Sequence, residues 1–181
     1  MEGSGAGRGL RVKVDSEWLE AEGVRFSISD IVEGWQQGML GAHDVIRLAT
    51  NEVTLGSDEP LMVELVCLLR SDVDKVGDLL GVEPVDSCAS LPETIHGPFR
   101  RKLAFLALRR LYLRREEEGD GFWERVEAVW CDLGHPEELE GFIRWMPAPL
   151  GQESGEDAMM RRLEDFLEAG QVQWIGVVAA S

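Results

Sequence analysis

The stretch Phe99–Glu117, FRRKLAFLALRRLYLRREE, is the longest helical pattern in the sequence. Apolar residues recur along it at the spacing of an α-helix. Gly119 and Gly121 follow and are expected to end the helix. The same spacing recurs on both sides of this stretch, so the sequence predicts an all-α fold. The apolar positions of the stretch include Leu103, Leu106, Ala107, Leu111 and Leu113.

Glycine, proline and capping residues divide the rest of the chain into shorter helical patterns. Ser29 is expected to cap the first of them, with Asp30 and Glu33 in its first turn. Together with the long stretch, these patterns predict about eight helices in a single globule of packed helical hairpins. The terminal segments Leu10–Val14 and Gln171–Val178 are each compatible with a short β-strand. The shorter patterns begin near Ser29, near His43, behind Ser57, at Ser71, at Phe122, at Pro136 and near Glu156.

The predicted domain organisation is simple. Residues 1–12 form a Gly-rich segment that we expect to be a flexible tail. Residues 13–181 are expected to form a single α-helical domain. Within it, the stretch 82–98 contains three prolines and no clear period, so it is the best candidate for a linker, a lid or a sub-boundary.

Length, charge and cysteine usage limit the function. The chain has 181 residues, 44% of them hydrophobic, which is enough for a core. It carries 34 acidic against 18 basic residues, a net charge of −16, which argues against nucleic acids and anionic membranes as partners. No apolar stretch is long enough to span a bilayer. Three separated cysteines cannot build a disulfide framework and favour a reducing, cytoplasmic environment.

Two blocks carry a family resemblance. The first is Ser29–Ala49, SDIVEGWQQGMLGAHDVIRLA, and the second is Phe122–Met146, FWERVEAVWCDLGHPEELEGFIRWM, which Pro147 follows directly. Together they resemble the bacterial domain of unknown function 2247, over a region from Ser27 to about Ala169. The resemblance implies a small, acidic, helical protein with no catalytic residues to carry over. In size and charge, such proteins are similar to the immunity proteins encoded beside bacterial toxins.

Motifs for catalysis or cofactor binding are missing from the sequence. His43, His96 and His135 are far apart, and no two cysteines have the spacing of a zinc site. Cys131 and His135 are four residues apart, but Gly134 is expected to end the helix between them, which favours a buried thiol and a loop imidazole. No nucleophile elbow, phosphate-binding loop or zinc-protease motif occurs. We therefore expect no enzyme activity and no cofactor or metal.

Basic residues are concentrated in one helix. The segment 100–115 contains seven of them and no acidic residue. In an otherwise acidic chain, this pattern favours an internal clamp, in which the cations pair with carboxylates of neighbouring helices and their stems cover the edge of the core.

Acidic runs and tryptophans mark the candidate partner-binding surface. One reading of the acidic runs is a solvated surface that keeps the protein soluble; the other is a surface that meets a basic partner. Of the six tryptophans, Trp35, Trp130 and Trp145 are at core-facing helical positions, whereas the pattern does not assign Trp18, Trp123 and Trp174 to the core. Aromatic rings beside carboxylates are typical of protein-binding patches. The candidate partner-binding residues are Glu137, Glu138, Glu140 and Trp145, followed by Glu116, Glu117 and Glu118.

The sequence therefore predicts a non-enzymatic bacterial protein that binds a basic protein, with an immunity protein that neutralises a toxin as the most specific version. Two alternatives stay open: a helical adaptor or scaffold, and an enzyme whose carboxylates and histidines come together only in the fold.

Overall fold

The computed structural model describes residues 23–68, 70–83 and 97–175. These residues contain eight α-helices and no β-strand, which confirms the predicted all-α fold. The α-helices are α2 (Ile28–Gln36), α3 (Ala42–Thr54), α4 (Pro60–Val66), α5 (Val76–Leu80), α6 (Pro98–Leu113), α7 (Arg115–Glu118), α8 (Phe122–Asp132) and α9 (Glu156–Gly170). Shorter 3₁₀ segments are η1 (Arg70–Lys75), η2 (Gly119–Gly121) and η3 (Glu137–Phe142), and η4 (Gln171–Ile175) is a π-helical turn.

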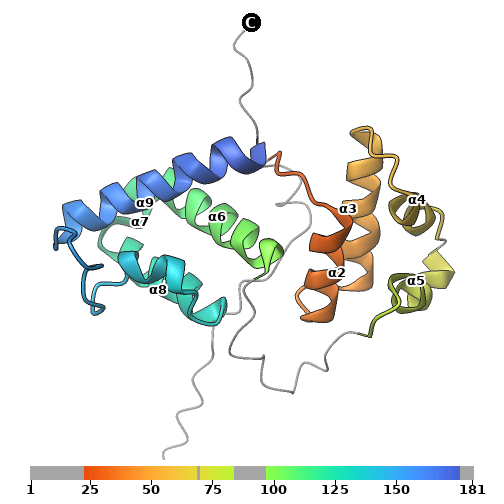
Figure 1. The fold of residues 1–181 in the computed structure, drawn as a ribbon, viewed down its shortest axis with the longest axis horizontal. Coiled ribbons are helices and arrows are strands. Elements are labelled where there is room, and N and C mark those ends of the chain that lie inside the picture. The colour runs from red at the N-terminus through yellow and green to blue at the C-terminus, as the bar shows by residue number, and fades with distance from the viewer. Residues whose placement is uncertain (1–22, 69, 84–96, 176–181) are drawn as a thin grey trace, which may run out of the picture.

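Helix α6 is the central element of the second half of the molecule, where it lies between α8 and α9 (Figure 1). Its residues 103–108 are all buried, so no face of this part of α6 meets solvent. Helices α2 and α3 stand at one end of α6, and α4 and α5 lie on their far side (Figure 1). Helix α2 contacts α6 closely at Gly34, where an added Cβ would lie 2.7 Å from the ring of Phe99.

Two buried carboxylates hold the chain that leads into α2. Glu52 of α3 accepts hydrogen bonds from the backbone N–H of Phe26, at 2.7 Å, and from Nε of Arg25, at 2.6 Å. Asp30 of α2 accepts from the backbone N–H of Ser27 at 2.7 Å and from Nζ of Lys102 at 2.6 Å. Because Lys102 belongs to α6, the second contact joins the two halves of the molecule.

Helix α6 also receives its N-terminal cap from α2. Its N-cap residue, Gly97, offers no side chain, and its first turn contains no acidic residue. Instead, Oε2 of Glu33 accepts a hydrogen bond from the backbone N–H of Phe99 at 3.1 Å. A Cβ at position 97 would overlap the Glu33 carboxylate, so only glycine leaves room for this contact. Helix α2 thus supplies the negative charge that favours the start of α6.

The basic residues of α6 serve in part as the predicted internal clamp. Lys102 pairs with Asp30 of α2, and Nε of Arg101 lies 3.1 Å from a carboxylate oxygen of Glu138 in η3. Both pairs join α6 to another element, as predicted. Arg115, the first residue of α7, instead contacts a residue close to it in the sequence, because its guanidinium lies over the ring of Tyr112.

Two predicted helix limits are wrong. Ser27, not Ser29, caps α2, because Asp30 reaches back to the backbone N–H of Ser27 while the Ser27 hydroxyl accepts from that of Asp30. The predicted helix Phe99–Glu117 is divided at Arg114, whose backbone leaves the helical conformation, into α6 and α7.

Further predictions are wrong at the ends of α4 and α9. Cys67 lies in an apolar helical pattern, which predicts a core position, but it is exposed because α4 ends at Val66 and the chain turns before the apolar face continues. The segment Gln171–Ile175 continues α9 as a π-helical turn instead of forming a strand. The predicted tail 1–12, the strand Leu10–Val14 and most of the stretch 82–98 lie outside the described residues.

We expect the Asp30–Lys102 pair to be important for stability. The Lys102→Met substitution removes the cation and leaves the buried Asp30 carboxylate, only 1% exposed, without a counter-charge. The free energy of unfolding, measured by urea denaturation, should fall by about 3 kcal/mol. The double variant D30N/K102M should recover part of this loss, because an amide can still accept the bonds from Ser27.

The matched control is Lys75→Met, which breaks the exposed pair between Lys75 and Asp72. Its free energy of unfolding should be almost unchanged, because water screens exposed ion pairs. Equal free energies of unfolding for the Lys102 and Lys75 variants would contradict the stabilising role of the Asp30–Lys102 pair.

Tyr112, the only tyrosine of the chain, reports on the contact between α6 and α9. Its hydroxyl donates a hydrogen bond to Glu164 at 2.6 Å, and this bond, followed by burial, raises the pKa of Tyr112 above its ordinary value. The stabilisation by the Tyr112–Glu164 hydrogen bond is thus present below about pH 10. It is lost as the pH rises through the pKa of Tyr112 in the folded protein. Spectrophotometric titration of the phenol should show the raised pKa. Glu164→Ala should return it toward the ordinary value, whereas Glu168→Ala, on the same helix, should not.

Candidate functional site

The described histidines and cysteines do not assemble a metal site, and His96 and Cys88 lie outside the described residues. No group of three or more His, Cys, Asp or Glu residues there could hold a metal ion. His43 and His135 are exposed, and the His135 ring packs edge-on against Trp130. Cys131 is exposed rather than buried, because it lies on the outer face of α8. Partial burial, followed by the charges of Asp132 and Glu127, raises the pKa of the Cys131 thiol, so the thiolate is disfavoured.

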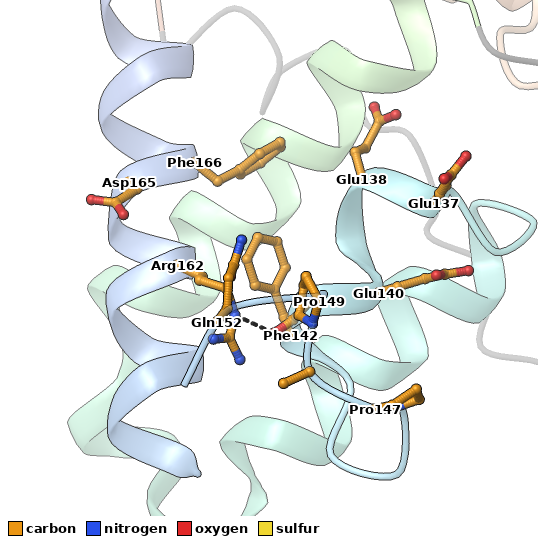
Figure 2. A pocket seen from close by; sticks show the side chains of 12 residues that line it. Glu137, Glu138, Glu140, Phe142, Pro147, Pro149, Gln152, Arg162, Asp165 and Phe166 are labelled. Atoms are coloured by element: carbon orange, nitrogen blue, oxygen red, sulfur yellow. Dashed lines mark hydrogen bonds between the residues drawn. The ribbon is translucent and has the colours of Figure 1, made fainter. Parts of the chain in front are cut away.

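An open groove of about 610 Å³ brings three of the predicted partner-binding residues together (Figure 2). It lies between η3, the loop that follows η3, and α9, and it contains neither His43 nor His135. We call it the η3–α9 groove. Its lining comprises Glu137, Glu138, Glu140, Gly141, Phe142, Pro147, Ala148, Pro149, Gln152, Arg162, Asp165 and Phe166.

The segment η3 is a 3₁₀ helix rather than the α-helix predicted from Pro136 to Met146. Leu139 and Phe142 are buried and three residues apart, which places them on one face of a 3₁₀ helix. The carboxylates on the other sides of η3 are therefore turned away from the core. The preceding turn is tight: His135 has a left-handed backbone, with φ of 61°.

Arg162 of α9 fixes the walls of the η3–α9 groove. It donates from Nε to the carbonyl of Gly141 and from Nη1 to the carbonyl of Glu153, both at 2.9 Å. Phe142 of η3 meets Phe166 of α9 edge to face, with ring centroids 5.7 Å apart. These contacts join η3, the loop and α9 into one surface, and the bond from Arg162 to Gly141 is the dashed line in Figure 2.

The carboxylates of the groove occupy its rim. Glu137 and Glu140 extend away from the interior, and Asp165 points outward from α9 (Figure 2). Within the described residues, these three make no hydrogen bond or ion pair. Glu138 differs, because Arg101 partly neutralises it. The rim therefore keeps most of its negative charge.

Trp145 is exposed and lies outside the lining of the groove. The chain becomes extended at Ile143, so the helical spacing that predicted a core position for Trp145 does not continue. Trp145 is 65% exposed, and its ring packs edge-on against the buried Trp130 at 5.3 Å. The preceding Arg144 donates to Glu124 and Glu127 of α8, which raises the pKa of Arg144 and holds this segment on α8.

The remaining predicted residues lie elsewhere. Glu116, Glu117 and Glu118 form most of α7 and do not line the groove. Glu116 and Glu117 are exposed, whereas Glu118 pairs with Arg125 of α8. The structure therefore groups Glu137, Glu138 and Glu140 but separates them from the α7 acids.

Sequence reasoning missed the α9 side of the groove. The helical spacing of the segment near Glu156 predicts a core position for Phe166, and no sequence pattern singles out Arg162 or Asp165. Their spacing on α9, at positions 162, 165 and 166, places them on neighbouring parts of the helix surface. The available signal was this proximity, but nothing in the sequence shows that α9 faces η3.

Comparisons with known proteins give a family and no closer relative. A family model described as "Uncharacterized protein conserved in bacteria (DUF2247)" matches residues 17–171. Among curated proteins and among solved structures, no match to the chain was found. The matched region includes both blocks that carry the resemblance, all of the described helices and the η3–α9 groove. The chain therefore belongs to DUF2247, a family of uncharacterised proteins conserved in bacteria.

Proposed function

We propose that this protein is a non-enzymatic binding module that captures a basic protein through its acidic exterior. The observation that carries the proposal is the surface formed by η3 and the residues after it. Here the charged rim of the groove precedes the exposed Trp145 by a few residues in the chain. Large aromatic side chains held on a rigid support are frequent anchors of protein interfaces.

Electrostatics favour a basic partner. The net charge is −16, and part of the positive charge of α6 is used internally by Arg101 and Lys102. The exterior therefore presents carboxylates that have no partner among the described residues, such as those of Glu137 and Glu140. A field of one sign attracts an oppositely charged protein from a distance and speeds association.

The most specific version of the proposal is an immunity protein that neutralises a cognate toxin. A toxin that degrades nucleic acid needs a basic surface where it binds the phosphates. An acidic inhibitor can cover such a surface and block access of the substrate. This mode of inhibition depends on affinity alone and needs no catalytic residue.

The test is capture of a partner from the lysate of the native bacterium, at low and at high salt. The wild-type protein should retain a basic protein at low salt and release it as salt rises. The double variant E137K/E140K should weaken binding of that protein by roughly tenfold or more, because two attractive charges become repulsive. W145A should have an effect of similar size through loss of the aromatic anchor.

The matched control is D58K/E64K, which changes the net charge by the same amount at exposed positions of the first half of the molecule. It should reduce association only slightly. Equal loss in both double variants would mean that net charge alone governs binding. A retained protein that is acidic, or a complex that is insensitive to salt, would refute the proposal.

A further inference from the structure

The interior of the η3–α9 groove differs chemically from its rim. Phe142, Phe166 and Pro149 give the interior an apolar floor, which Figure 2 shows between η3 and α9. Phe166 is only partly buried, so part of its ring remains available for contact. An apolar depression with a charged edge is the usual form of a pocket for one anchoring side chain.

Arg162 determines where a positive charge can sit. Its guanidinium lines the groove and donates to two backbone carbonyls, and no carboxylate of the described residues forms an ion pair with it. A lysine or arginine of the partner would be repelled from the interior. The same cation would be attracted to the rim, where Glu137, Glu140 and Asp165 have no partner among the described residues.

We propose that the η3–α9 groove receives a segment of a basic protein in which one bulky apolar side chain is flanked by lysine or arginine. The apolar side chain packs against Phe166 and Pro149, which are only partly buried, and the flanking cations meet the carboxylates of the rim. The inference rests on the proposed function and adds to it the chemistry of the recognised segment. Charge complementarity indicates a basic segment, and the apolar floor indicates that the central residue of this segment is apolar.

The probes are two heptapeptides, acetylated and amidated, with the sequences Gly-Lys-Lys-Leu-Lys-Lys-Gly and Gly-Lys-Lys-Ala-Lys-Lys-Gly. Binding to the full chain is measured by isothermal titration calorimetry at low salt. The leucine peptide should bind roughly tenfold more tightly than the alanine peptide, because only leucine buries apolar area on the floor. Both affinities should fall as salt rises.

A variant that fills the groove tests whether the leucine side chain of the peptide binds there. Gln152 is exposed and lies in the middle of the groove in Figure 2, so Gln152→Trp should abolish the preference for leucine. Gln171→Trp, at an exposed position outside the lining, should retain it. Equal binding of the two peptides by the wild-type protein would overturn the inference, and so would an unchanged preference in the Gln152 variant.

The two proposals fail in different ways. If the peptides bind equally while E137K/E140K still loses the captured protein, the acidic surface binds its partner by charge and the groove does not select an apolar residue. If neither peptide binds at low salt, the groove inference is also overturned. Failure of the proposed function is judged separately, from the identity and salt sensitivity of the captured protein.

Discussion

The structure depends on how two buried carboxylates are neutralised. Asp30 and Glu52 are almost completely excluded from water, and a buried charge without partners would be very costly. Glu52 accepts hydrogen bonds from the chain before α2, and Asp30 forms an ion pair with Lys102 of α6. The second pairing fixes α2 against the helix on which α8 and α9 pack. Arg101, the neighbour of Lys102 on α6, pairs with Glu138, so the same end of α6 also contacts η3.

The distribution of charge follows from the same arrangement. Helix α6 directs Arg101 and Lys102 toward carboxylates of other elements. These cations therefore stabilise the fold instead of offsetting the negative charge of the surface. The 3₁₀ form of η3 has the complementary effect, because it buries Leu139 and Phe142 while the carboxylates of the segment face outward. An acidic rim around an apolar floor results from ordinary packing requirements, and it is the basis for proposing a basic, apolar-centred ligand.

Periodicity predicted the all-α fold and most of the α-helices in the described part of the chain. It did not predict features that depend on contacts between distant residues. Leu139 and Phe142 fit the spacing of both an α-helix and a 3₁₀ helix, so the sequence could not distinguish them. Trp145 follows the extended residue Ile143, and this break removes it from the core-facing series. The groove could not be predicted, because the sequence does not show which face of α9 meets η3.

The cap that Glu33 provides for α6 has a consequence for folding. An isolated α6 would begin with a glycine and a proline and would have no acidic residue to stabilise its first turn. Because this stabilisation comes from α2, the N-terminal and C-terminal halves are not independent folding units. We expect the chain to unfold in one cooperative transition, and a fragment that begins at Gly97 to retain a frayed first turn and reduced helicity.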